Sequence, residues 1–386
     1  MGLRRRGRKI LTAQTLEGHA ITLSLEMKRE QLREWRRTKD FYCCQCKEQV
    51  QLKIGDINIP HFAHRKDTAC VADFSEGESK EHLLGKMLLF SFFQTHSSAV
   101  QLEPFLKMVS QRPDLLVTTK ISKIPIEFQC SIIPTADVIS RTDGYRSIDM
   151  EPIWILQTPA KFNTLAEGVG VFHFSKFHEQ FFMRKSPEEL VLLTFNPQTK
   201  RFHYFSSLIH VAGKRYIGIH RSLSIHYQTF PFAEPNAPSK DELERYAALF
   251  ASMRNDFLQS RILLNRRGVR DPFLRKCYEL RFLPTNLPSW VGIPVPFADA
   301  FQEHDCEWQL AIVYFVRRKG IGFHQLTENL IRKLMDCQEN NSERKIQACL
   351  AYRNFLLSIG INSSRENVAF NEINIFKLIS DRFLAN

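Results

Sequence analysis

The chain has no uncharged apolar stretch close to the roughly 18 residues that a membrane-spanning helix needs. Its basic start, MGLRRRGRKI, is not followed by an apolar run of signal-peptide length, and Arg6 breaks the pattern for attachment of myristate to Gly2. The sequence also lacks internal repeats and low-complexity tracts. These absences predict a protein that is not inserted into a membrane.

Cysteine is present, but not in a pattern typical of disulfides. The nine cysteines are an odd number at irregular spacings, in a chain of 386 residues that is far too long for a disulfide-stapled mini-protein. Such usage favours a reducing, cytoplasmic compartment in which some of the thiols bind metal.

Acidic residues are fewer than basic ones. The formal net charge is +12, and the first 75 residues carry 15 Lys and Arg against 9 Asp and Glu, so half of the excess lies in the first fifth of the chain. A concentrated basic segment favours a polyanionic partner, with nucleic acid as the first candidate. A soluble protein that only happens to have a high isoelectric point is the alternative.

The order of predicted elements indicates an α/β protein of several domains. A helix over 74–94, a strand over 99–106, a hairpin over 112–132, a helix over 135–147 and a strand over 152–157 predict a mixed sheet flanked by helices. Apolar residues make up 44% of the chain, which is enough for a sizeable core.

Three segments are expected. They are an N-terminal hairpin and zinc-ribbon-like module over 1–73, a central α/β domain with a β-rich extension over 74–235, and a helical C-terminal domain over 236–386. Ser239 and Glu242 have the spacing of a capping box and predict that a long amphipathic helix starts the last segment.

The N-terminal segment contains five candidate zinc ligands. Cys43 and Cys46 are spaced so that two thiolates on one tight turn can reach a single Zn²⁺, and a predicted hairpin leads to His61, His64 and then Cys70. This order is typical of a zinc ribbon, although five candidates compete for four positions. Both histidines can bind only if the chain turns there, as the preceding proline allows, because residues three apart on a strand face opposite sides. A reduced pair of core cysteines is the alternative.

The most informative stretch is the hairpin over 112–132. Asp114 opens its first strand, and Glu127, Gln129 and Ser131 alternate along the second, so these polar side chains share one face. Unpaired polar groups are costly to bury, and this arrangement suits a divalent cation with a water beside it. A half-solvated hairpin whose polar face meets water is the alternative.

The helix before this hairpin carries a second polar row. Glu78, His82 and Lys86 follow one another at intervals of four residues, so they line one stripe of an otherwise apolar helix. The stripe either lies at the surface as a chain of charged pairs or faces a site.

Together these motifs resemble a known family. The CxxC pair, IPHFAH, GESKEHLLGK, RPDLLV, IEFQCS, a later Arg and Tyr, and IWIL occur in order over residues 10–160, and the series is similar to that of the bacterial competence protein CoiA. The resemblance implies a zinc-ribbon-like module and a restriction-endonuclease-like domain of the PD-(D/E)XK type. It also implies a role in processing incoming DNA and promoting its recombination, with the recombinase RecA as partner.

The resemblance assigns roles to particular residues. Asp114 takes the acid of the "PD" position and Glu127 the second acid, so the pair would hold Mg²⁺ or Mn²⁺. Gln129 stands where most of the superfamily has lysine, and Glu78 and His82 match the family's ESxxH run. Because Gln129 adds no positive charge, Lys86 from the helix is a candidate to supply it.

Two functions from different classes follow. One is a metal-dependent deoxyribonuclease acting in natural transformation, and the intact pair of acids favours it. The other is a recombination mediator on a degenerate nuclease fold, which binds DNA and RecA without cutting the DNA, and Gln129 favours it. A general zinc-ribbon nucleic-acid-binding protein is a third, weaker candidate.

Overall fold

A computed structural model describes the following residues: 9–55, 58–64, 79–162, 164–184, 189–264, 268–335 and 342–363. Glu78 and Cys70, both predicted site residues, lie outside them. The chain divides into two compact units. The first consists of Met1–Leu165, Leu193–His203 and Ser222–Glu234, and the second of Ala166–Leu192, Tyr204–Arg221 and Pro235–Asn386. This division does not follow the three predicted segments, because part of the β-rich stretch groups with the C-terminal helices.

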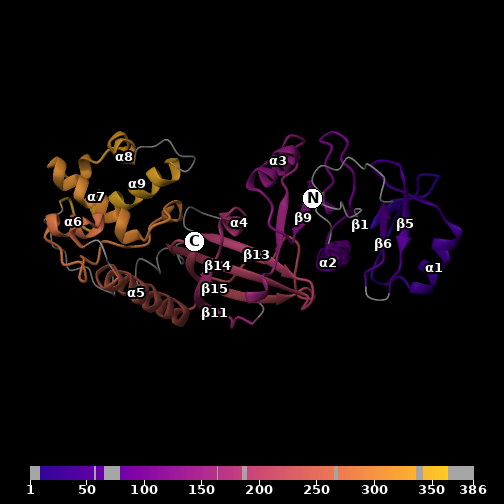
Figure 1. Ribbon diagram of the computed structural model, residues 1–386, viewed down its shortest axis with the longest axis horizontal. Helices are drawn as coiled ribbons and strands as arrows, with labels where there is room; N and C mark the ends of the chain where they lie inside the picture. The colour runs from indigo at the N-terminus through magenta and orange to yellow at the C-terminus, as the bar shows by residue number, and fades with distance from the viewer. Residues whose placement is uncertain are drawn as a thin grey trace. The chain divides into compact units, whose positions relative to one another are not determined.

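An antiparallel sheet of six strands forms the N-terminal part of the first unit (Figure 1). In spatial order its strands are β1 (Lys9–Ile10), β6 (His61–His64), β5 (Gln49–Lys53), β4 (Phe41–Tyr42), β2 (Thr12–Gln14) and β3 (Ala20–Thr22), and helix α1 spans Arg29–Thr38. Phe41 and Phe62 pack against each other in its core with tilted rings, whose centroids are 4.9 Å apart. The register of β5 with β6 pairs Val50 with His64, which fixes where the second ligand pair of the predicted zinc module lies.

A larger mixed sheet follows, as the element order predicts. The described strands run in the spatial order β11-β15-β14-β13-β10-β9-β8-β7, and β12 pairs with β13. Strands β7, β8 and β9 are antiparallel, whereas β10 is parallel to both β9 and β13. The bounds are β7 Ala99–Leu102, β8 Leu115–Thr118, β9 Lys123–Gln129, β10 Ile153–Gln157, β11 Gly168–His173, β12 Met183–Arg184, β13 Leu190–Asn196, β14 Arg201–Ala212 and β15 Arg215–Ser224.

Helix α2 (Lys80–His96) packs on strands β7, β8 and β9. Its start is fixed by Ser79, whose side chain accepts a hydrogen bond from the His82 N–H, as at a typical N-cap. Leu83, Leu89 and Phe93 of this helix are buried. The lysine at position 86 is buried as well, which an ordinary amphipathic helix would avoid.

Gly85 lets α2 approach the sheet closely. A Cβ atom added there would lie 2.0 Å from Cε1 of Phe128 in β9, whose ring is buried. We therefore expect Gly85→Ala to lower the free energy of unfolding by about 1–3 kcal/mol, since an overpacked core displaces side chains or backbone. Urea denaturation measures the loss. Ser91→Ala, at an exposed position of the same helix, is the control and should be neutral or slightly stabilising; equal stability of the two variants would contradict this packing.

One hydrophobic core holds the second unit together. It joins β14 and β15 with the C-terminal helices, and the buried Tyr246 hydroxyl donates to the carbonyls of Ser207, at 2.6 Å, and Ile217, at 2.8 Å. The predicted capping box is confirmed, because the side chains of Ser239 and Glu242 each accept from the backbone N–H of the other. The α-helices from here on are α5 Lys240–Leu263, α6 Pro272–Leu280, α7 Asp305–Lys319, α8 Glu328–Met335 and α9 Ser342–Ser358.

Two further helices belong to the sheet region, α3 (Thr135–Arg146) between β9 and β10, and the short α4 (Lys176–Glu179). Among the described residues, no helix combines the length and apolar character needed to cross a membrane.

Candidate functional site

Asp114 and Glu127 meet at one end of the β8–β9 hairpin. Leu115 pairs with Ile126 in the antiparallel register, so the next pair outward is Asp114 opposite Glu127. The Phe128 N–H donates to Asp114 Oδ2 at 2.9 Å, which ties the first acid to the strand that carries the second. The hairpin predicted from the alternating polar row therefore brings the two acids together.

Asp114 is contacted by an imidazole and an ammonium group from α2. His82 Nε2 lies 3.2 Å from Asp114 Oδ2, and Lys86 Nζ lies 3.8 Å from Asp114 Oδ1. Burial alone would raise the pKa of Asp114, but the charges of His82 and Lys86 and the Phe128 N–H outweigh it and hold the pKa well below its usual range. Asp114 is thus an anion at any ordinary pH, and the predicted helix stripe faces a site.

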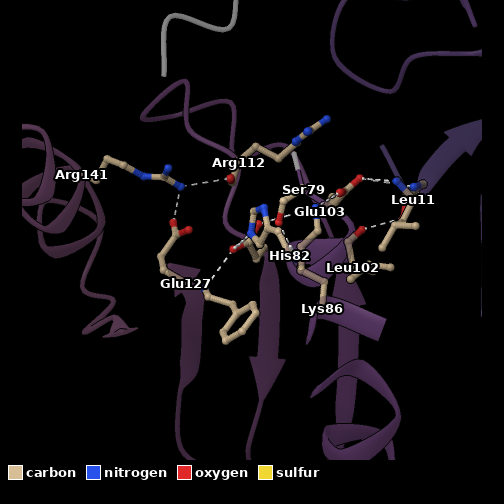
Figure 2. A network of polar contacts seen from close by, with 12 residues as sticks. Leu11, Ser79, His82, Lys86, Leu102, Glu103, Arg112, Glu127 and Arg141 are labelled. Carbon is tan, nitrogen blue, oxygen red and sulfur yellow. Dashed lines mark hydrogen bonds and ion pairs between the residues drawn. The ribbon is translucent and has the colours of Figure 1, made fainter. Parts of the chain in front are cut away.

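Glu127 is held from the opposite side by helix α3. The Arg141 guanidinium donates to Glu127 Oε1 and also to the Arg112 carbonyl at 3.4 Å (Figure 2). The Tyr145 hydroxyl donates to the same Glu127 oxygen. Burial raises the pKa of Glu127 to about 6 and the nearby Asp114 charge adds to this, although Arg141 and Tyr145 favour the charged form. The two acids therefore differ in environment, and only Glu127 titrates near neutral pH.

A third buried acid adjoins the pair. Lys86 makes a closer ion pair with Glu103 than with Asp114, and both Lys86 and Glu103 are almost completely shielded from solvent. Glu103 directly follows β7 and its N–H donates to the Asp114 carbonyl at 2.8 Å. Lys86 therefore shares its charge between two carboxylates.

The arrangement leaves one oxygen of each acid for a ligand. Both donors to Glu127 bind Oε1, and both hydrogen-bonding contacts of Asp114 go to Oδ2. Throughout the described part of the chain, no donor lies within hydrogen-bond distance of Glu127 Oε2 or Asp114 Oδ1, and the ammonium of Lys86 is 3.8 Å from the latter. Two carboxylate oxygens completed by waters and phosphate fit Mg²⁺, which is usually bound by one or two protein carboxylates.

Gln129 lies on the same face of β9 as Glu127, but its amide has a local partner. Its Nε2 donates to the Ser131 carbonyl at 2.7 Å and to the Ser131 hydroxyl at 3.3 Å. The structure thus brings His82, Lys86, Asp114 and Glu127 together and leaves Gln129 two residues away with its NH₂ group engaged.

A second candidate metal site lies in the N-terminal sheet. One ligand atom from each of Cys43, Cys46 and His64 falls within 4.8 Å of the others, and Cys46 Sγ is 3.3 Å from His64 Nε2. Thiolates and imidazole are the donors that Zn²⁺ prefers, so three of the predicted ligands fit the ion. Within the described ranges this is the one group of three or more potential ligands that lie so close together.

The chain does not turn at the two histidines, so the condition under which both could bind one ion is not met. His61–His64 is strand β6, kept extended by its ladder with β5, and the two side chains point to opposite faces. His61 Nδ1 instead lies 2.8 Å from the Ile59 carbonyl, and His61 does not join the cluster.

We expect the affinity of this cluster for zinc to fall as the pH drops below about 6. Burial alone would raise the pKa of Cys43, but contacts with His64 and with backbone N–H groups lower it to about 6. The thiolate is present above that pH, and its contribution is lost below it, where protons compete with metal. Zinc per chain, measured after dialysis from pH 8 to about pH 5, should fall, and Cys43→Ser should lose most of its zinc at every pH. Cys44→Ser is the control; equal loss in both variants would contradict the assignment.

Comparison with known proteins places these sites in a family context. The family model described as "Competence protein CoiA, nuclease-like domain" matches residues 78–234, and "Competence protein CoiA, N-terminal domain" matches residues 24–73. The chain belongs to the CoiA family. It is 30% identical over 173 residues to "Competence protein CoiA" of Bacillus subtilis (strain 168). That alignment covers 45% of each protein, so it spans less than half the length of this relative, and no solved structure matches significantly.

Both candidate sites fall within the CoiA matches. The Cys43, Cys46 and His64 cluster lies in the N-terminal domain, and Asp114 and Glu127 lie in the nuclease-like domain. Sequence reasoning missed Glu103. The available signal was an acidic residue that immediately follows the strand AVQL, next to the buried Leu102.

Proposed function

We propose that this CoiA family member processes DNA in natural competence and hydrolyses phosphodiester bonds with Mg²⁺ or Mn²⁺ held by Asp114 and Glu127. The observation that carries the proposal is the adjacent pair of the partly buried Asp114 and the buried Glu127, each with one oxygen that makes no hydrogen bond among the described residues. The match to a nuclease-like domain supports the same reading, as does the PD-(D/E)XK pattern of Pro113-Asp114 and Glu127.

The residues of the chain supply most of the electrostatics. When bound, the cation would polarise the scissile phosphate and acidify a bound water. His82 and Lys86 keep Asp114 ionised, so that a ligand oxygen is available at all working pH values. Lys86 and Arg141 bring positive charge close to the acids, which favours the approach of a phosphodiester anion and offsets the lack of lysine at position 129.

The rest of the proposal concerns partners. The basic chain, with net charge +12, is expected to bind the DNA backbone with an affinity that falls as salt rises. RecA is the partner that the family resemblance proposes, and a cytoplasmic location agrees with the cysteine usage. The zinc cluster is given a structural role, since an ion held there would tie the turn between β4 and β5, which carries Cys43 and Cys46, to His64 on β6.

The test is incubation of the purified full-length protein with single-stranded and duplex DNA, in Mg²⁺, in Mn²⁺ and in EDTA. Wild type should cut in the metals and not in EDTA, and Asp114→Asn should cut far more slowly than wild type. Cleavage by this variant at the wild-type rate would come from a contaminant or another site and would contradict the assignment.

A recombination mediator that binds DNA and RecA without cutting is the second candidate. Gln129 favours it, because a neutral amide bound to Ser131 neither adds charge nor points its NH₂ group at the acids. Wild type that binds DNA in a salt-dependent manner but leaves it intact in both metals would select this function. A Lys86→Ala protein with full metal-dependent cleavage would exclude Lys86 as the substitute charge.

A further inference from the structure

Glu103 connects the acid pair with the N-terminal sheet. The backbone φ of Glu103 is 53°, a left-handed conformation that is uncommon in residues other than glycine. Its N–H donates to the Asp114 carbonyl, so the backbone of Glu103 is fixed beside the candidate site. The backbone contact therefore fixes where the Glu103 side chain begins, and Figure 2 shows this side chain next to Lys86.

The two carboxylate oxygens of Glu103 have different partners. Oε1 accepts from the Lys86 ammonium, whereas Oε2 accepts from the backbone N–H groups of Leu11, at 2.9 Å, and Thr12, at 3.3 Å. The Thr12 hydroxyl also donates to the Leu102 carbonyl at 2.9 Å, and all these contacts are buried. Leu11 and Thr12 lie where β1 passes into β2, so the N-terminal sheet contributes two donors to this network.

We propose that Glu103 is a positioning residue that holds the Lys86 ammonium away from Asp114 Oδ1, and that the β1–β2 junction holds Glu103 in turn. The inference rests on the proposed function, in which Asp114 binds a divalent cation. Lys86 Nζ is 3.8 Å from Asp114 Oδ1 and forms a much closer pair with Glu103. Without the Glu103 charge, the ammonium would be drawn onto Asp114 and would compete with the cation for the same oxygen.

The same geometry makes the N-terminal sheet part of the site. A carboxylate can accept from Lys86 on one oxygen and from two N–H groups on the other, but an amide has only one accepting oxygen. Glu103 therefore couples the hydrogen bonds of residues 11 and 12 to the cation affinity of Asp114. Such a coupling is reciprocal, so cation binding at Asp114 should strengthen these hydrogen bonds as much as they strengthen cation binding.

Glu103→Gln in the full-length, zinc-loaded protein tests the proposal with two measurements. Amide hydrogen exchange without added Mn²⁺ should be about tenfold or more faster at Leu11 or Thr12, because a hydrogen bond to a charged acceptor is lost. Calorimetric titration with Mn²⁺ should show affinity lowered about tenfold or more, with Asp114→Asn defining binding elsewhere. Glu151→Gln, which removes the charge of an exposed acid paired with Arg146, is the matched control and should change neither measurement.

A rescue separates positioning from general damage. Adding Lys86→Met to Glu103→Gln removes the competing ammonium and should return Mn²⁺ affinity towards the wild-type value, which a merely structural role would not produce. Glu103→Asp keeps the charge and should retain Mn²⁺ affinity, and it takes the place of Glu103→Gln if that variant fails to fold.

Unchanged Mn²⁺ affinity in folded Glu103→Gln, or no rescue in the double variant, overturns the proposal. Wild type that binds no Mn²⁺ overturns the proposed function instead, and unchanged exchange at both amides in Glu103→Gln rejects the link to the N-terminal sheet independently of metal.

Discussion

The Asp114→Asn protein is expected to cleave DNA about a thousandfold more slowly than wild type in Mg²⁺, while it remains folded and binds DNA. The reason is the loss of one of two carboxylates that hold the cation, which acts as a Lewis acid worth several kcal/mol, and each 1.36 kcal/mol is a factor of about ten in rate. The fold should persist, because an asparagine oxygen can still accept from the Phe128 N–H and Lys86 keeps its pair with Glu103.

Initial rates on labelled single-stranded and duplex DNA measure this effect, beside binding measured in EDTA. Asp143→Asn removes an acid at an exposed position of helix α3 and serves as the matched control, for which wild-type rates are expected. Wild-type rates in Asp114→Asn would remove Asp114 from the reaction. Wild type that binds but does not cut would leave the acid pair as a feature of a DNA-binding scaffold.

The local part of the candidate site was predictable from the sequence. Alternation along one strand indicated that Glu127 and Gln129 share a face, and the spacing of His82 and Lys86 indicated that they share a stripe of one helix. These relations depend only on the repeat of the strand or the helix. The structure agrees, since His82 and Lys86 both reach Asp114.

The partners of these residues come from elements placed by tertiary packing, and no periodicity indicates them. Arg141 binds Glu127 because α3 lies beside β9, and Glu103 meets Leu11 although 92 residues separate them in the chain. The question left open at His61 has the same origin, because the ladder with β5 keeps the chain extended where a proline allowed a turn. Relations within one helix, one strand or one hairpin could therefore be read from the sequence, whereas partners that come from distant elements could not.

Breaking the Arg141–Glu127 pair is expected to have the largest effect on stability. Arg141→Met should lower the free energy of unfolding by about 3–5 kcal/mol at pH 7.5, because it leaves a buried carboxylate with Tyr145 as its remaining hydrogen-bond donor in the described structure. The side chain of Glu127 is 3% exposed and that of Arg141 17%, so solvent screens the pair weakly. Unfolding in urea at several pH values measures the loss.

The pH dependence of this loss identifies its cause. The pKa of Glu127 is about 6 in the folded protein, above the ordinary value of 4.5, so the neutral carboxyl is favoured by folding. Its stabilising contribution is complete below about pH 4.5 and is lost as the pH rises through about 6. Without Arg141 the pKa rises further, so the deficit of Arg141→Met should be large at pH 7.5 and should shrink towards pH 4.5, where Glu127 is neutral in both proteins.

Two controls separate charge from packing. Arg146→Met lies on the same helix and removes an exposed pair with Glu151, so it should change stability little at any pH. Adding Glu127→Gln to Arg141→Met removes the uncompensated charge and should recover much of the lost stability at pH 7.5. The loss of stability could instead be the same at pH 7.5 and pH 4.5 and persist when Glu127→Gln is added. This result would show that Arg141 stabilises the fold by packing against Trp154 and not by neutralising the charge of Glu127.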